Sequence, residues 1–125
     1  MYPYFSRAEL QCRCGCGRAR MGDGFMRKLV ALREAAGFPF IVTSAYRCPE
    51  HNARVSSTGE RGPHVTGRAI DIAVSHERAL WVVSHAVEHG FTGVGVNQKG
   101  AVNFRFIHLD DLTAPDYPRP NVWSY

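Results

Sequence analysis

Long apolar runs are missing from this sequence. No stretch of the 125 residues approaches the run of about 18 apolar residues that marks a membrane-spanning helix. The first residues, MYPYFSRAELQCRC, also lack the apolar segment of a secretory signal peptide. We therefore expect no membrane insertion, and we expect synthesis in the cytoplasm without a signal peptide.

Clusters of basic residues, internal repeats and low-complexity tracts are missing too. The formal net charge is +4, but Lys and Arg are spread from Arg7 to Arg119 without a run. Nucleic-acid-binding faces need clustered basic residues, so we expect no nucleic-acid partner. With 45% hydrophobic residues, the chain is predicted to form one globular domain over residues 1–125, and we expect a monomer.

Helical and strand patterns alternate along the chain. Apolar spacing predicts helices over 25–36 and 77–89, and the buried face of the second is predicted to hold Leu80, Val83, Ala86 and Val87. Short β-branched or aromatic runs predict strands over 40–46, 68–74, 93–96 and 104–109, the last two as an antiparallel pair. This order predicts an α+β fold: a small, mostly antiparallel sheet with helices packed on one side.

Two segments carry no regular pattern. Residues 49–63 are rich in Pro, Ser, Gly and charge and are predicted to form a loop. Residues 113–125 contain three prolines and are predicted to form an irregular tail, held against the body by Trp123 and Tyr125.

Three polar residues stand in or near apolar stretches, where a buried polar side chain needs a hydrogen-bond partner or a metal ion. His64 and Asp71 lie in GPHVTGRAID, and His108 lies in RFIHLDD. A carboxylate between two isoleucines is costly to bury unless it is paired or bound to metal. Two imidazoles and one carboxylate form a zinc ligand set that leaves one position open for water. For His108, a core histidine bonded to a carbonyl group is the alternative.

Several stretches resemble one known family. FSRAELQCRCGCG, IVTSAYRCPEHN, GPHVTGRAIDI, GFTGVGV and RFIHLDD are similar, in this order, to the zinc D-alanyl-D-alanine carboxypeptidase and L-alanyl-D-glutamate endopeptidase family, particularly its short phage-endolysin-like and prophage members. The resemblance implies the zinc-peptidase fold shared with the hedgehog signalling domain. It also implies one Zn²⁺ on His64, Asp71 and His108, hydrolysis of amide bonds in peptidoglycan stem peptides, and action on the cell wall or in the periplasm after release.

The resemblance also implies a role for Arg47, in SAYR. The corresponding family arginine meets a substrate carboxylate or polarises the scissile carbonyl, and a planar guanidinium suits both tasks. The chain departs from the family pattern at Pro63, where many members have Ser, and at Arg105, where many have Asp or Glu.

The group that moves the proton is therefore predicted from the residues. Asp110 is the first candidate because it shares a strand face with His108. Its alternative role is to orient a metal ligand or Arg47. Glu60 and Asp111 are weaker candidates.

Four cysteines, Cys12, Cys14, Cys16 and Cys48, form a separate signal. A second, structural zinc site, one or two disulfides, and reduced thiols all agree with the C-x-C-x-C spacing. With any of these chemistries, we expect the cysteines to tie the N-terminal segment to the Arg47–Cys48 loop. The alternative function for the whole chain is a catalytically inactive, zinc-containing module that binds peptidoglycan.

Overall fold

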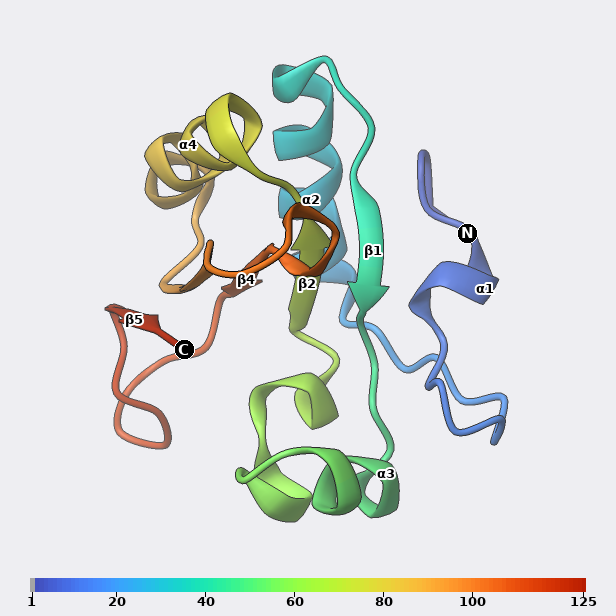
Figure 1. The fold of residues 1–125 in the computed structure, drawn as a ribbon. Coiled ribbons are helices and arrows are strands. Elements are labelled where there is room, and N and C mark those ends of the chain that lie inside the picture. Colours follow the sequence, from blue (N-terminus) through green and yellow to red (C-terminus); the bar gives the residue numbers. More distant parts are fainter. Residues whose placement is uncertain (1) are drawn as a thin grey trace.

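A computed structural model describes residues 2–125, and these residues form an α+β fold with one five-stranded sheet (Figure 1). The strands are β1 (Ile41–Ser44), β2 (Ala69–Ala73), β3 (Gly93–Asn97), β4 (Phe106–Asp110) and β5 (Asn121–Ser124). Their order across the sheet is β1-β2-β4-β3-β5, and every neighbouring pair is antiparallel except β3 with β5. The predicted fold class is confirmed.

Helices α2 (Asp23–Ala36) and α4 (His76–Ala86) pack together on one face of the sheet (Figure 1). Shorter elements complete the chain: α1 (Arg7–Leu10), α3 (Pro49–Val55), and the 3-10 turns η1 (Gly59–Arg61), η2 (Pro63–Thr66), η3 (Val87–His89) and η4 (Val102–Phe104). The helix α3 and the turns η1 and η2 lie in succession between β1 and β2.

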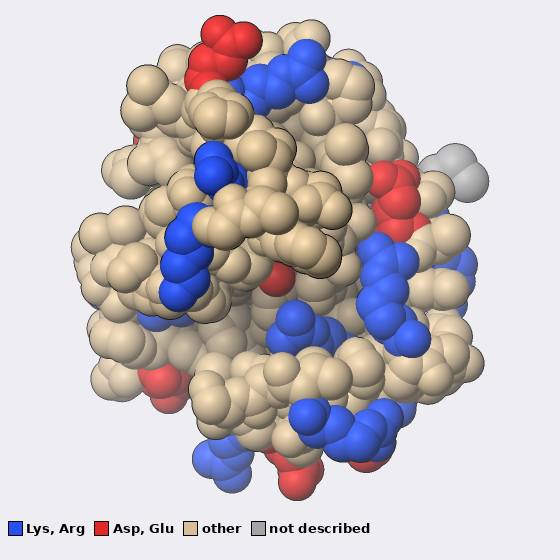
Figure 2. All heavy atoms as spheres, viewed as in Figure 1, with Lys and Arg blue, Asp and Glu red and all other residues tan. Residues whose placement is uncertain are grey.

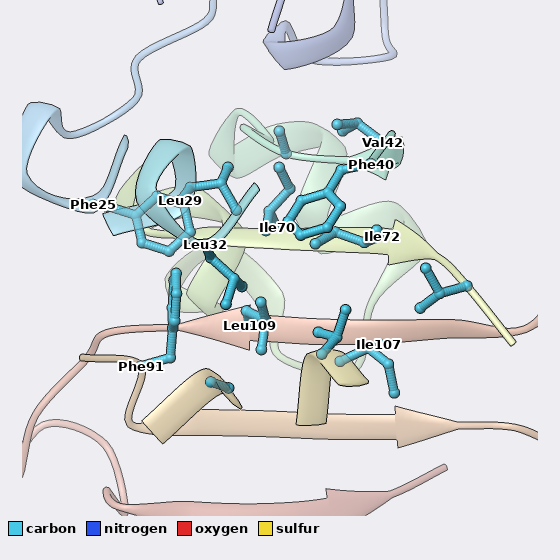
Figure 3. Close-up of a cluster of buried hydrophobic side chains, with 14 of the residues drawn as sticks. Phe25, Leu29, Leu32, Phe40, Val42, Ile70, Ile72, Phe91, Ile107 and Leu109 are labelled. Atoms are coloured by element: carbon cyan, nitrogen blue, oxygen red, sulfur yellow. The ribbon is translucent and has the colours of Figure 1, made fainter. Parts of the chain in front are cut away.

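The core lies between the sheet and the helices α2 and α4. Alternate strand residues point to the same face, so Ile70 and Ile72 of β2 meet Ile107 and Leu109 of β4 there (Figure 3). On α2, the buried residues follow helical spacing: Phe25, Met26, Leu29 and Leu32. All the polar site residues predicted on β2 and β4 therefore point to the opposite face.

Helix α4 buries a different face from the one predicted. Its buried residues are Ala79, Val82 and Ala86, whereas Leu80 is 70% exposed and Val87 is 73% exposed. Small alanine side chains let a helix approach its neighbours closely, and the prediction ranked large apolar residues above them. Only Val83, which is partly buried against the core, and Ala86 agree with the predicted face.

The predicted loop over 49–63 is also wrong, because it contains α3 and η1. Pro49 occupies the first turn of α3, directly after the capping residue Cys48. Proline is favoured at this position because its missing N–H would have no partner within the helix. The Pro, Ser and Gly content of the segment concealed this start signal.

The C-terminal tail is only partly irregular, since β5 adds a parallel edge strand next to β3. This correction concerns a strand of four residues, most of them exposed, whose alternation is too short to be recognised. The aromatic anchors are where they were predicted: Trp123 packs on His108 with ring centroids 5.1 Å apart, and Tyr125 packs on Phe106 at 5.0 Å.

Among residues 2–125, no helix has both the length and the apolar character needed to cross a bilayer.

Leu29→Ala should destabilise the protein far more than Leu80→Ala. Leu29 is fully buried in the core, so its truncation should lower the free energy of unfolding by about 2–5 kcal/mol. Leu80 is exposed on α4, and its truncation should change the free energy of unfolding by no more than about 0.5 kcal/mol. Urea unfolding at a fixed zinc concentration measures both, and equal losses would contradict the observed face of α4.

Candidate metal centre

Asp71 and His108 meet because β2 and β4 are in register. Asp71 pairs with His108, His108 pairs with Gly95 of β3, and Gly95 pairs with Trp123 of β5. This row crosses the face of the sheet that α2 and α4 leave uncovered. A shift of one residue in either strand would send these side chains into the core.

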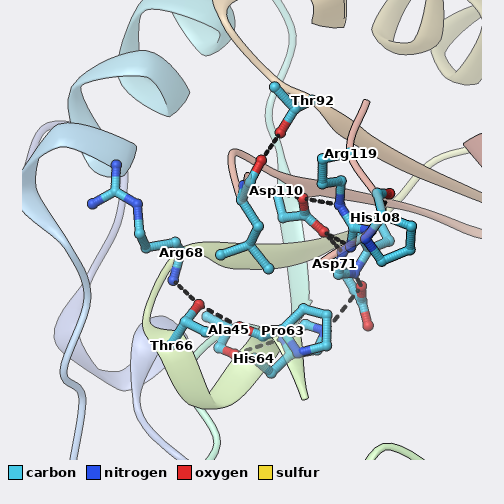
Figure 4. Close-up of polar contacts among 12 residues, drawn as sticks. Ala45, Pro63, His64, Thr66, Arg68, Asp71, Thr92, His108, Asp110 and Arg119 are labelled. Atoms are coloured by element: carbon cyan, nitrogen blue, oxygen red, sulfur yellow. Dashed lines mark hydrogen bonds and ion pairs between the residues drawn. The ribbon is translucent and has the colours of Figure 1, made fainter. Parts of the chain in front are cut away.

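His64 reaches the same place from η2. Its Nδ1 lies 2.7 Å from the carbonyl oxygen of Ala45, just after β1. Because a carbonyl oxygen only accepts, Nδ1 carries the proton and Nε2 is left with its lone pair. That Nε2 lies 3.3 Å from Oδ1 of Asp71 (Figure 4). The backbone carbonyl thus selects the tautomer that a metal ligand needs.

The three side chains have the spacing of zinc ligands. Nδ1 of His108 is 3.0 Å from Oδ1 of Asp71, and one donor atom from each of His64, Asp71 and His108 lies within 4.8 Å of the others. Zinc–nitrogen and zinc–oxygen bonds of about 2.0–2.1 Å give a tetrahedron with edges of about 3.3–3.4 Å. The donor set and its distances therefore fit a divalent zinc ion, with a further position left for water or substrate.

The electrostatics of the group favour a cation. Burial would raise the pKa of Asp71, but its contacts with His108 and His64 hold that pKa well below its usual range. Burial would lower the pKa of His108, and the hydrogen bonds to Asp110 and Asp71 raise it instead. A cation bound here would take the place of the proton on Nδ1 of His108, so metal affinity should fall as the pH drops.

Asp110 lies behind His108 and is fully buried. Its Oδ2 accepts from Nε2 of His108 at 2.8 Å, and Arg119 donates to both of its oxygens, each at 2.8 Å (Figure 4). Although burial opposes it, Arg119 together with His108 lowers the pKa of Asp110 to about 2. A carboxylate held in this way fixes the orientation of the ring and directs Nδ1 toward Asp71.

The weaker candidates for the proton-moving group have other surroundings. Asp111 is buried in an ion cluster, where Arg68 donates to both of its oxygens and Lys28 donates to one. Glu60 is exposed on η1 and lines a second hollow, as Asp116 does. The role of Asp110 in proton transfer stays a prediction; its contacts are those of a residue that positions His108.

Arg119 is a site residue that was not predicted from the sequence, and Trp123, predicted as an anchor of the tail, lies at the site as well. Both stand in the proline-rich tail, where no periodic pattern marks them. The sequence of β3 did contain a sign that the tail lies over it, since Gly93 and Gly95 alternate on the face that carries the site. A side chain at Gly93 would collide with Asp110 and Arg119, and one at Gly95 would lie 2.7 Å from Nε1 of Trp123. These glycines leave room for the tail over the strand.

A cleft of about 550 Å³ opens onto the three ligands. One side of it comes from α3 to η2, and the other comes from Phe106 and the tail, including Tyr117 and Tyr125. Figure 2 shows the hollow near the middle of this face of the molecule, with atoms of acidic and basic residues inside it.

Arg47 lies in this cleft together with His64, Asp71 and His108. Its Nη1 donates to Oδ1 of the buried Asn52 at 3.1 Å, and this is its only side-chain hydrogen bond within residues 2–125. The remaining N–H groups of the guanidinium are available to an anionic ligand. The structure thus brings Arg47 to the candidate metal site, as predicted, and adds Asn52 as its support.

The comparisons with known proteins agree with this site. A family model described as Peptidase M15 matches residues 3–110, a span that includes Arg47 and all three ligands. The chain belongs to the peptidase M15 family. The resemblance noted in the sequence is thereby confirmed, while Arg119 and Trp123 lie beyond the matched span. Neither the comparison with curated proteins nor that with solved structures gave a match.

Asp110→Asn should weaken zinc binding by about 10–100-fold, the usual effect of losing a carboxylate that orients a ligand. The amide cannot balance the charge of Arg119 and does not hold Nε2 of His108 as firmly. Chelator competition at constant pH measures the dissociation constant, and Asp116→Asn, at an exposed position of the tail, is the matched control. An unchanged constant for Asp110→Asn would show that this carboxylate does not support the metal site.

Proposed function

We propose that this member of the peptidase M15 family is a zinc metallopeptidase that hydrolyses amide bonds in peptidoglycan stem peptides. The observation that carries the proposal is the cleft in which His64, Asp71 and His108 converge beside Arg47. His64, Asp71 and His108 would hold a zinc ion, which would supply Lewis-acid chemistry for activating water and polarising an amide carbonyl.

Charge in the cleft supports a substrate that carries carboxylates, as stem peptides do. Arg47 and Arg61 line the cleft, and within residues 2–125 the only acidic side chain that lines it is that of Asp71. A guanidinium can bind a carboxylate through two parallel hydrogen bonds, and this fixes the orientation of the peptide. Arg47 would therefore hold the substrate so that the scissile carbonyl lies at the open side of the ligand set.

The other residues of the site support this arrangement. Asp110 and Arg119 keep the His108 ring in place, and Trp123 covers that ring. Tyr125 also lines the cleft, and its phenol, whose pKa burial raises further above neutral, can donate a hydrogen bond there. Such a donor stabilises negative charge that develops on a carbonyl oxygen.

The finer parts of the proposal concern the biological setting. The family membership and the cationic cleft support action on the cell wall, in the manner of a phage endolysin, after release from the cytoplasm. The arrangement of the cleft suits both a carboxypeptidase and an L-alanyl-D-glutamate endopeptidase, since Arg47 would bind a substrate carboxylate in either case.

Purified protein with zinc should release new free amines from peptidoglycan, and chelator should abolish the release. His108→Ala removes one metal ligand and should lower the rate by at least about 1,000-fold while the fold persists. His76→Ala, at an exposed position of α4, is the matched control and should keep full activity. Full activity of His108→Ala would refute the assignment of the site, and mass spectrometry of the muropeptides would identify the bond that is cut.

A second candidate function is an inactive, zinc-containing module that binds peptidoglycan. Two observations favour it: the buried position of Asp110 and the presence of Arg105 in place of the acidic residue found in many relatives. Zinc-dependent sedimentation with peptidoglycan, without release of amines at any zinc concentration, would establish this function instead.

Arg47→Ala should lower kcat/KM by about 10–100-fold, since hydrogen bonds to charged groups contribute about 1.5–3 kcal/mol each. The loss should appear mainly in KM if Arg47 holds a remote carboxylate, and mainly in kcat if it polarises the carbonyl. Arg54→Ala, at an exposed position of α3, serves as the control. If both variants behaved like the wild type, the role of Arg47 in substrate binding would be wrong.

A further inference from the structure

The four cysteines come together at a place separate from the cleft. Cys12, Cys14 and Cys16 lie in the segment between α1 and α2, and Cys48 directly precedes α3. Figure 1 shows this N-terminal segment beside the connection from β1 to α3. The sulfur atoms of all four lie within 4.8 Å of one another, although 36 positions in the sequence separate Cys12 from Cys48.

The sulfur–sulfur distances are those of a metal site. Sγ of Cys12 is 3.5 Å from Sγ of Cys14 and 3.7 Å from Sγ of Cys48, and Cys14 is also 3.7 Å from Cys48. Zinc–sulfur bonds of about 2.3 Å give a tetrahedron with edges of about 3.8 Å. A disulfide would hold two sulfur atoms at about 2.05 Å. The observed separations match the edges of a tetrahedron of thiolates.

The backbone and its neighbours complete the site. Gly15 (φ 89°) and Gly17 (φ 78°) adopt left-handed conformations, which lets the alternating cysteines of the C-x-C-x-C segment turn toward one centre. The backbone N–H of Cys48 donates to Sγ of Cys12, and Nε of Arg18 donates to Sγ of Cys16, both at 3.4 Å. Donors of this kind stabilise the charge of thiolate ligands.

We propose that Cys12, Cys14, Cys16 and Cys48 bind one structural zinc ion. Four thiolates fill a tetrahedral shell and leave no position for water or substrate, so this ion would take no part in hydrolysis. Thiolates select zinc over magnesium or calcium. The inference is independent of the peptidase activity, because it depends only on the sulfur cluster.

The proposed ion holds the chain that presents the cleft. Cys48 follows Arg47, whose backbone N–H donates to the carbonyl oxygen of His64 at 3.2 Å. Ala45, three residues before Cys48, accepts from Nδ1 of His64. The segment from Ala45 to Cys48 thus joins the sulfur cluster to a ligand of the first site. Loss of the structural ion should therefore weaken metal binding by His64 as well.

Metal analysis of the purified full chain tests the proposal. The wild type should contain two zinc ions per chain. Cys16→Ser should lose the thiolate-bound ion, and His108→Ala should lose the other. Substitution with cobalt should give a sulfur-to-cobalt charge-transfer band in the near ultraviolet, and this band should persist in His108→Ala and vanish in Cys16→Ser.

A measurement on the wild type covers the case in which Cys16→Ser fails to fold. Titration of the native protein with a mercurial reagent should release the thiolate-bound zinc ion, one per chain, to an indicator. Three results would overturn the proposal: no release of zinc by the mercurial reagent, an intact mass lowered by the hydrogens lost in disulfide formation, or iron in place of zinc.

Discussion

The buried carboxylate of Asp71 is the constraint around which this fold is organised. An ionised carboxylate in a sheet interior is tolerated only if opposite charge and hydrogen-bond donors surround it. Nδ1 of His108 donates to this carboxylate, and Nε2 of His64 faces it. The other nitrogen of each imidazole donates to a second acceptor, the carbonyl of Ala45 or the carboxylate of Asp110. The chain of partners ends at Arg119.

This chain of partners explains the asymmetry of the sheet. One face is apolar and covered by α2 and α4, whereas the other carries the polar row and is covered only by short elements and the tail. Glycine at positions 93 and 95 makes the second face thin enough for Arg119 and Trp123 to lie directly over it. The cleft is the part of this face that those elements leave open. The candidate metal site and a packed core are thus built on the same strands, with alternate residues assigned to each.

Much of this arrangement could be predicted from the sequence, because the strands alternate strictly. Asp71 between Ile70 and Ile72, and His108 between Ile107 and Leu109, leave one choice of face, and the same rule places Asp110 beside His108. The sequence pattern gives no information where tertiary packing decides which residues are buried or which strands pair. The exposure of Leu80, the helix α3 in a Pro- and Ser-rich segment, and the pairing of β5 with β3 depend on neighbours that are distant in sequence. Arg119 was missed for the same reason: its partner, and not its local sequence, gives it a role.

The parallel pairing of β5 has a consequence for how the molecule matures during translation. His64, Asp71 and His108 leave the ribosome in that order, and Arg119 and Trp123, which neutralise Asp110 and cover His108, follow them. Until Arg119 and Trp123 emerge, the imidazole of His108 faces a carboxylate that lacks its guanidinium, and its ring is open to solvent. A nascent chain can therefore assemble the apolar half of the domain first, and the half that carries the candidate metal site is finished only after β5 has left the ribosome.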